Sequence, residues 1–411
     1  MHYQIEDVFS PRSFPENTYI SRKLDDEESI DDRLKRALAM RGNLIFVSGA
    51  SKSGKTVLCH KVIAEDAYVA LSGNQISSKA DFWNHIAEQL PLYDTVVTTT
   101  KEQQGNNQQK QAQLGLNFGV ATIGVSVHNN RGQNVDQQLA MTASRTERQI
   151  IKYLIENNKV LVIDDFHYVA KEMQLYIART LKTELFNGLK AVIISLPHRS
   201  DEAIICNPDL IGRTTSLEIL PWSAAELKEI AEKGFTLLNL QIGEAEKALL
   251  AQESIASPQL MQENCFQLAF LAQRKNQLID IELIQEAFKR TAKNYAHYEQ
   301  LIKAMAQGPM QGMGRRKLYA LADSSVDIYH LLLLALKADP PVTELHLSDL
   351  KIRISCLLKN GELLSSSIIS ATLNKIIKIV GGNMPELDAL EYKNQCLYIL
   401  DPFLLFYLRW K

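Results

Sequence analysis

Residues 49–56, GASKSGKT, combine glycines, hydroxyls and a lysine in the order G-x-x-x-x-G-K-[ST]. Glycines let a loop fold tightly, so that successive backbone N–H groups point at phosphate oxygens, and a following helix adds partial positive charge. Lys55 is expected to reach the β- and γ-phosphates, and Thr56 to offer its hydroxyl to Mg²⁺. This stretch therefore predicts a phosphate site for a nucleotide with magnesium. Its expected residues are Gly49, Ala50, Ser51, Lys52, Ser53, Gly54, Lys55, Thr56 and Val57.

Two adjacent aspartates end an apolar stretch, VLVIDD, at residues 160–165. A buried strand of this kind brings Asp164 to the carboxyl edge of a parallel sheet, where it is expected to bind Mg²⁺, mostly through water. Asp165 stands where many P-loop ATPases have a glutamate that orients the attacking water, and the shorter acid predicts slow turnover. The alternative for Asp165 is a helix-capping carboxylate. His167 is either a polar relay near the water or a packing histidine.

A polar residue, Ser195, also ends the apolar stretch AVIIS, where its hydroxyl would sense the γ-phosphate. Arg199 and Arg213 follow it, and their order along the chain suits a phosphate contact in cis or from a neighbouring subunit. An arginine supplied in this way stabilises transition-state charge. A structural salt bridge is the alternative for each arginine, and the sequence leaves both readings open.

The elements that position these residues follow from hydrophobic periodicity. Apolar residues at helical spacing alternate with short apolar runs, which favours a parallel sheet covered on both faces. Ser78 is a plausible N-cap for the third helix. We expect helices at 27–41, 53–67, 78–90 and 149–158 and strands at 44–47, 68–74, 159–167 and 189–199.

Residues 95–135 interrupt this rhythm with a glutamine-rich stretch and then period-2 apolar spacing, which predicts an inserted β-hairpin. The hairpin is either a surface flap or an oligomer or partner contact. From Trp222 the pattern is helical, and the glycine- and methionine-rich stretch 307–316 separates a last segment. The predicted domains are 1–220, an α/β P-loop domain; 221–305, a helical lid; and 306–411, the last segment.

Composition limits the class of protein. The chain has 411 residues, 46% of them hydrophobic, with a net charge of −2, so bulk charge does not drive it onto nucleic acid or membranes. Its five cysteines show no metal-ligand spacing, which favours reduced thiols. The start lacks a signal-peptide pattern, and the longest apolar run is too short to span a bilayer. We expect a cytoplasmic protein without a membrane partner.

The order of the motifs resembles the AAA+ superfamily, and more specifically its origin-recognition and STAND branches. Residues 18–22, TYISR, are similar to the aromatic-arginine box that helps enclose adenine, which implies that Tyr19 and Arg22 bind the nucleotide. Residues 256–261, ASPQLM, resemble the proline motif of STAND lids and imply a nucleotide contact by Pro258, although Ser257 replaces the usual glycine. The resemblance implies ATP and Mg²⁺ as the bound groups, with ADP as the product.

The last segment resembles a winged helix. Helical patterns at 326–337, 343–354 and 365–380 precede the expected wing strands in 389–402, and ILDPFLLFYLRW is similar to the closing stretch of related ATPases. A packing role that holds the ATPase closed is favoured over DNA binding through Lys375 and Lys378. The basic excess is small, because residues 301–411 have 13 Lys and Arg against 10 Asp and Glu.

Three functions fit these expectations. The first is an ATP-binding, slowly hydrolysing switch whose nucleotide state controls homo-oligomer assembly or a separate effector protein; the resemblance extends to bacterial ATPases of antiphage defence. The second is a DNA-binding ATPase that acts as a loader or as a transposition or replication regulator. The third is a nucleotide-binding scaffold that never hydrolyses.

Overall fold

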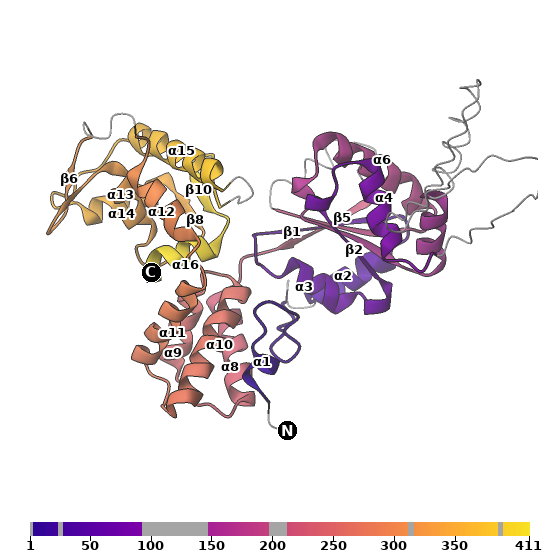
Figure 1. The fold of residues 1–411 in the computed structure, drawn as a ribbon, viewed down its shortest axis with the longest axis horizontal. Coiled ribbons are helices and arrows are strands. Elements are labelled where there is room, and N and C mark those ends of the chain that lie inside the picture. Colours follow the sequence, from indigo (N-terminus) through magenta and orange to yellow (C-terminus); the bar gives the residue numbers. More distant parts are fainter. Residues whose placement is uncertain (1–2, 24–27, 93–146, 197–211, 311–315, 385–388) are drawn as a thin grey trace, which may run out of the picture. The chain divides into compact units, whose positions relative to one another are not determined.

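The computed structural model describes residues 3–23, 28–92, 147–196, 212–310, 316–384 and 389–411. The chain forms two units, which are described separately (Figure 1). The sheet unit comprises residues 23–48 and 55–218, and the helical unit comprises residues 1–22, 49–54 and 219–411. Residues 1–22 thus belong with the helices that follow residue 219. The hairpin predicted at 95–135 lies outside the described residues.

The sheet unit is built on a sheet of five strands in the order β2-β3-β4-β1-β5. Strand β4 pairs in parallel with both β1 and β3, and β2 pairs in parallel with β3. Strands β1, β3 and β4 are buried along almost their whole length, as expected for a parallel sheet with both faces covered. The bounds are β1 Leu44–Gly49, β2 Tyr68–Ser72, β3 Val160–Asp164, β4 Lys190–Ser195 and β5 Thr214–Ile219.

Helices cover both faces of this sheet. In Figure 1, α4 and α6 lie on one face, and α2 and α3 lie on the other. Ser78 accepts a hydrogen bond from the Asp81 backbone N–H at 3.1 Å, which confirms the predicted N-cap of α4. The bounds are α2 Ile30–Ala39, α3 Lys55–Val62, α4 Lys79–Glu88, a helix at 147–156 and α6 Lys171–Phe186, with short 3₁₀ turns at η1 Glu65–Ala67, η2 Gly73–Gln75 and η3 Phe166–Tyr168.

Strand β5 is an element that the sequence pattern did not reveal. It is an edge strand, and its sequence TTSLEI contains only two apolar residues, Leu217 and Ile219, which are the two that are buried. An edge strand has one neighbour and buries less of its length, so its hydrophobic signal is weak. The predicted parallel sheet is confirmed, with one more strand than expected.

The helical unit shares one hydrophobic core, which runs from α1 to α16 and includes Phe235, Phe288 and Phe406. Its first helices are α1 Ile5–Val8, α8 Ala224–Leu237, α9 Glu244–Glu253, α10 Pro258–Lys275, α11 Ile281–Lys293 and α12 Tyr298–Gln307. The last segment adds α13 Ile328–Leu336, α14 Leu347–Leu357, α15 Ser366–Asn383 and α16 Pro402–Trp410. Among the helices of the described ranges, none combines the length and the apolar character that crossing a membrane would need.

The last segment also has a small antiparallel sheet of three strands in the order β8-β10-β9. Its strands are β8 Glu344–His346, β9 Leu390–Lys393 and β10 Cys396–Ile399, and a separate pair is formed by β6 Tyr319–Ala320 and β7 Ser325–Val326. Asn394 and Gln395 join β9 to β10 with φ values of 51° and 59°, as a tight two-residue hairpin requires. The segment therefore has helices near the three expected stretches and two strands within 389–402, whereas β8 takes up the first residues of the stretch expected to be helical at 343–354.

Candidate functional site

The loop at residues 49–54 belongs to the helical unit and depends on its glycines. A Cβ on Gly49 would lie 2.8 Å from the Ile219 Cβ and 3.0 Å from the Ser53 Oγ, so no larger residue fits there. Gly54 has a φ of +95°, a conformation that L side chains rarely adopt. Lys52 is also left-handed, with a φ of 62°. The glycine-rich sequence thus produces the tight loop that a phosphate cradle requires.

The first residues of α3 lie in the sheet unit and face the end of β3. Thr56 donates its hydroxyl to the Asp164 carboxylate across 2.5 Å, which joins the two residues predicted to hold magnesium. The other Asp164 oxygen accepts the Asp165 backbone N–H at 2.8 Å. Burial is the main cause that raises the pKa of Asp164, with a further contribution from the neighbouring Asp165 charge. Lys55 is buried at the start of the helix.

Asp165 has a left-handed backbone, with φ 52° and ψ 38°. It precedes η3 at the N-cap position, but its side chain makes no capping hydrogen bond. Its backbone lies close to Gly73, where an added Cβ would be 2.2 Å from the Asp165 carbonyl oxygen. The side chain of Asp165 is therefore not used as a helix cap, and Gly73 is a site-supporting residue that the sequence analysis missed. The dipeptide SG at the end of β2 is the signal that marks it.

Ser195 ends β4, which lies between β1 and β3 in the sheet. Its register partner on β1 is Ser48, the residue before Gly49. Ser195 is 1% exposed, and its hydroxyl oxygen has no hydrogen-bond partner among the described residues. The sheet order thus brings the predicted sensor serine to the same carboxyl edge as Asp164.

Arg22, one residue of the predicted adenine box, makes a dense set of contacts within the helical unit. Its Nε donates to Glu226 at 2.7 Å, and its terminal nitrogens donate to the carbonyls of Leu220 and Pro221 at 2.8 and 3.2 Å. Its guanidinium carbon also lies 4.8 Å from the centre of the Trp222 ring. The Arg22 side chain is therefore committed to protein contacts in this structure.

Tyr19, the other residue of that box, is half-buried and stacks on Phe14 with ring centres 5.9 Å apart. Its carbonyl accepts a hydrogen bond from the Lys233 ammonium at 3.1 Å. Pro258 is the first residue of α10, and the buried Ser257 caps that helix by accepting the Leu260 N–H at 3.2 Å. The serine in place of the usual glycine thus has a structural role as an N-cap.

Of the two arginines considered for phosphate contact, Arg213 is the one that lies in a described range. Arg199 lies outside the described residues. Arg213 is exposed and precedes β5, and its carbonyl accepts the N–H of Leu44, the first residue of β1, at 2.8 Å. The phosphate loop follows the other end of β1, next to Ile219 at the other end of β5. A contact between Arg213 and the phosphate in cis is therefore not supported, because a strand length separates them.

The chemistry of these residues fits a magnesium nucleotide. A hydroxyl and a carboxylate oxygen, from Thr56 and Asp164, are the hard ligands that Mg²⁺ prefers. The buried hydroxyls of Ser53 and Ser195 lack partners among the described residues, and such groups are costly unless something pairs with them. Phosphate oxygens are acceptors of the type that these hydroxyls need.

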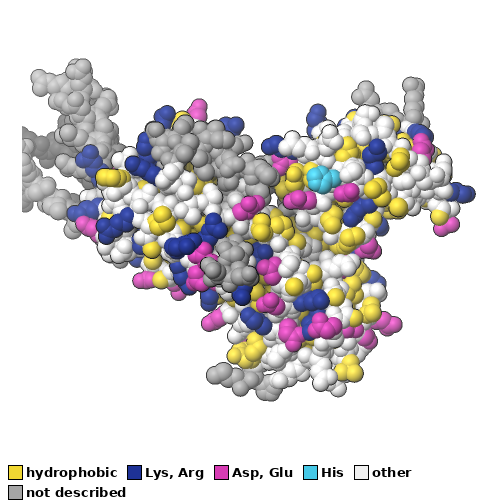
Figure 2. Space-filling view, turned by 180° about the vertical axis from the view of Figure 1, so that it is seen from behind, with side chains coloured by type: hydrophobic (Ala, Val, Ile, Leu, Met, Phe, Trp, Pro, Cys, Tyr) yellow, Lys and Arg dark blue, Asp and Glu magenta, His cyan; other side chains and the backbone are white. Residues whose placement is uncertain are grey.

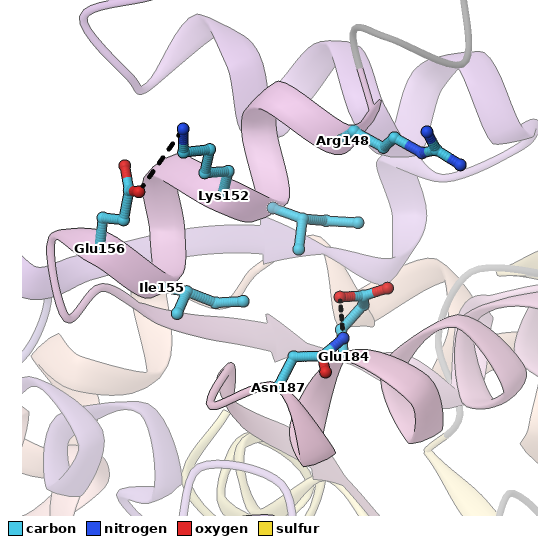
Figure 3. Close-up of a pocket in the computed structure, with 7 residues that line it drawn as sticks. Arg148, Lys152, Ile155, Glu156, Glu184 and Asn187 are labelled. Carbon is cyan, nitrogen blue, oxygen red and sulfur yellow. Dashed lines mark hydrogen bonds and ion pairs between the residues drawn. The ribbon is translucent and has the colours of Figure 1, made fainter.

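A separate hollow of about 290 Å³ lies on the sheet unit between the helix at 147–156 and the end of α6 (Figure 3). Lys152 and Glu156 form an ion pair at 3.7 Å on one side, and Asn187 donates to Glu184 at 3.1 Å on the other. The helix leads into the start of β3, and α6 leads into the start of β4. The hollow therefore belongs to the amino edge of the strands, whereas the site residues follow their carboxyl ends.

Comparison with solved structures finds chains similar to this one over nearly their whole length. The Walker-type ATPase PABY2304 of Pyrococcus abyssi is similar over 96% of this chain and 98% of its own, with 13% identity and a TM-score of 0.50. Cdc6p of Pyrobaculum aerophilum is similar over 98% and 97% of the two chains, with 15% identity and a TM-score of 0.44. No protein-family model and no curated protein matches the sequence. The chain has the α/β fold of a P-loop nucleoside triphosphatase, followed by a helical region.

Proposed function

We propose that the chain binds ATP with Mg²⁺, hydrolyses it slowly, and uses its nucleotide state to control self-assembly or a separate partner protein. The observation that carries the proposal is the hydrogen bond between Thr56 and Asp164, directly after the loop G-x-x-x-x-G-K-T. Two segments far apart in the sequence thus bring a hydroxyl and a carboxylate into contact, which supports a shared magnesium ion. The fold shared with a Walker-type ATPase supports this proposal.

Each residue has a proposed role in this activity. The N–H groups of residues 49–57 and Lys55 bind the phosphates, while Thr56 and Asp164 hold the metal ion, which supplies neutralisation of phosphate charge when bound. Asp165 orients the attacking water, and Ser195 contacts the γ-phosphate. Tyr19 and Pro258 bind on the nucleoside side. An arginine from a neighbouring subunit completes the site, for which Arg213 is a candidate in trans.

The family assignment is part of the proposal. The motif order and the fold support an AAA+ ATPase of the origin-recognition or STAND type, with a winged helix formed by α13 to α15 and β8 to β10. We propose that the winged helix packs as a regulatory domain, and that the protein acts in a nucleotide-controlled response such as antiphage defence. Its site of action is then the cytoplasm.

Replacement of Lys55 tests nucleotide binding. Lys55→Ala removes a charge-assisted contact to phosphate, so ATP affinity is expected to fall about 10- to 150-fold. Lys152→Ala is the control, because it removes an exposed lysine at the amino edge of the sheet, outside the residues proposed to bind phosphate. Titration calorimetry with MgATP gives both affinities. Equal affinity in Lys55→Ala and wild type would contradict the proposed phosphate site.

A DNA-binding loader is the second candidate, because Lys375 and Lys378 are both exposed on α15. Figure 2 shows, however, that Lys and Arg side chains are interspersed with Asp and Glu on one face of the helical unit. Particle size measured by light scattering with ATP, duplex DNA or both separates the two functions. ATP-dependent assembly without DNA supports the switch, whereas assembly that requires DNA and weakens steeply with salt supports the loader.

A further inference from the structure

Trp222 makes a direct contact with the phosphate loop. Its indole Nε1–H donates to the Ser53 carbonyl oxygen at 2.9 Å, and both residues belong to the helical unit. The Ser53 carbonyl and the Gly54 N–H are parts of one planar peptide, and among the described residues the cis peptide is the one at Asp339–Pro340. In a trans peptide these two groups point in opposite directions. A donor on the Ser53 carbonyl therefore fixes the direction of the Gly54 N–H.

The orientation of the Ser53–Gly54 peptide depends on contacts of this kind. Gly54 has a φ of +95°, and an added Cβ would meet no heavy atom within 4 Å, so its backbone conformation rather than lack of space is the reason for a glycine here. Glycine also moves between positive and negative φ at little energetic cost. The hydrogen bond from Trp222 favours the orientation of the Ser53–Gly54 peptide in which the Ser53 carbonyl faces the indole.

The indole is itself fixed by residues around the start of α8. The Arg22 guanidinium lies over the ring at 4.8 Å, a cation–π geometry that favours one ring position. Glu226 accepts from Arg22 Nε at 2.7 Å and from a terminal nitrogen at 3.3 Å. The same carboxylate accepts the Ser223 N–H at 2.7 Å in the capping box of α8. The indole position is thus tied to α8, the first helix after the sheet.

We propose that Trp222 is a positioning residue for the phosphate loop, which aims the Gly54 N–H at the bound phosphate and couples the loop to α8. The inference rests on the proposed nucleotide binding. In this arrangement the indole itself does not contact the nucleotide. It acts through the Ser53 carbonyl, so its loss weakens phosphate binding and leaves the other groups of the loop in place.

Trp222→Phe tests the hydrogen bond, because phenylalanine keeps an aromatic ring under Arg22 and removes the N–H donor. ATP and ADP affinities are expected to fall together by roughly 2- to 10-fold, the value of one net hydrogen bond. The midpoint of thermal unfolding without nucleotide should stay close to wild type. Trp83→Phe is the control, since Trp83 also donates its indole N–H at 2.8 Å, but to Tyr176 in the sheet unit. Its nucleotide affinity should not change.

Tryptophan fluorescence gives a second measurement that a purely structural role would not affect. The chain has three tryptophans, so Trp83→Phe/Trp410→Phe leaves Trp222 as the sole emitter. Saturating MgATP is expected to change the Trp222 emission, because bound phosphate adds negative charge next to the loop to which the indole is hydrogen-bonded. Unchanged affinity in Trp222→Phe would overturn the inference while the nucleotide site stands. Unchanged Trp222 emission at saturating MgATP would also overturn the inference. This measurement tests the inference even if Trp222→Phe does not fold. A wild-type protein that binds no ATP would overturn the proposed function and this inference together.

Discussion

Thr56 and Asp164 lie 108 positions apart in the chain, yet their side chains share a hydrogen bond of 2.5 Å. At the scale of single residues, such contacts depend on backbone geometry as much as on side-chain chemistry. Asp165 follows Asp164 with a left-handed backbone, and Gly73 leaves room for its carbonyl oxygen. Non-glycine residues in this conformation are uncommon, and they cluster at functional sites.

Asp165→Asn tests the proposed water-orienting carboxylate. Asparagine tolerates a φ of 52°, so the substitution removes the charge without new backbone strain. The ATP hydrolysis rate is expected to fall about 10²- to 10⁴-fold, the range for a lost general base, while ATP affinity stays near wild type. A phosphate-release assay and calorimetry measure the two quantities. Hydrolysis at the wild-type rate would show that Asp165 has no catalytic role.

A pair of glycine substitutions tests the backbone packing behind Asp165. Gly73→Ala places a Cβ 2.2 Å from the Asp165 carbonyl, so we expect a loss of about 1–3 kcal/mol in the free energy of unfolding. Gly381→Ala is the matched control, because this glycine lies in α15 with no heavy atom near its added Cβ. It should gain about 0.5–1 kcal/mol. Urea denaturation compares both, and equal stability of the two variants would contradict the close packing at Gly73.

At the scale of elements, the start of α8 combines a helix cap with an ion pair. Ser223 caps the helix because its hydroxyl accepts the Glu226 N–H at 3.2 Å, and the Glu226 carboxylate in turn accepts the Ser223 N–H at 2.7 Å. Arg22, which precedes the first strand in the sequence, forms an ion pair with Glu226. Burial is the largest single effect on the pKa of Glu226 and by itself would raise it. The hydrogen bonds from Arg22 and Ser223 together outweigh burial, so the pKa of Glu226 is lowered.

The lowered pKa of Glu226 predicts an acid-dependent loss of stability. Because the unfolded state binds this proton more readily, the stabilisation is present above the ordinary value of 4.5 and is lost as pH falls through the lower folded pKa. Glu226→Gln should therefore be less stable than wild type near neutral pH and less sensitive to acid below about 4.5. Glu229→Gln, on the exposed side of α8, is the control. Urea unfolding between pH 3 and 7, roughly spanning the ordinary glutamate pKa, measures the difference. An unchanged pH profile in Glu226→Gln would contradict the ion pair.

At the scale of the whole molecule, the helical unit joins its first helices to its last through a buried charge. Arg409 of α16 donates to Glu253 of α9 at 2.9 and 2.5 Å, and Trp410 donates to the same carboxylate at 2.6 Å. The Arg409 and Glu253 side chains are 9% and 2% exposed. Arg409 also pairs with Asp339 at 2.7 Å. A pair so deeply buried is costly to break from one side.

Arg409→Met should lower the free energy of unfolding by about 3–5 kcal/mol, because it leaves the Glu253 charge buried without its partner. Adding Glu253→Gln should restore part of that loss, since the glutamine is neutral and still accepts from Trp410. Lys303→Met is the control, because it breaks an exposed ion pair with Glu299 and should cost at most about 1 kcal/mol. Chemical denaturation of wild type, Arg409→Met, Glu253→Gln and the double variant gives the coupling free energy between the two side chains. A double variant less stable than Arg409→Met would contradict this account.

Much of the sheet and the glycine-rich loop at residues 49–54 were predictable because their signals are local. The loop motif, the strand VLVID and the Ser78 cap each follow from a few neighbouring residues. The edge strand β5 was missed because an edge strand carries little hydrophobic pattern. The contacts of the Arg22 side chain with residues 220–226 were also missed, because these partners lie about 200 positions away in the sequence. Trp222 was passed over for the same reason, although its place directly before the capping box SAAE is a usable signal.

The sequence alone determined the glycine-rich loop, the alternation of strands and helices, and the hydroxyl and carboxylate groups that are candidates for binding magnesium, because these depend on local spacing and side-chain chemistry. The tertiary structure alone decided which distant residues meet. It paired Thr56 with Asp164 and set Ser195 at the end of β4, between β1 and β3. It also left Arg213 before the start of β5 and brought the Trp222 indole to the Ser53 carbonyl. Strand order and register set these contacts, and they are fixed by the packing of the whole core rather than by any short stretch.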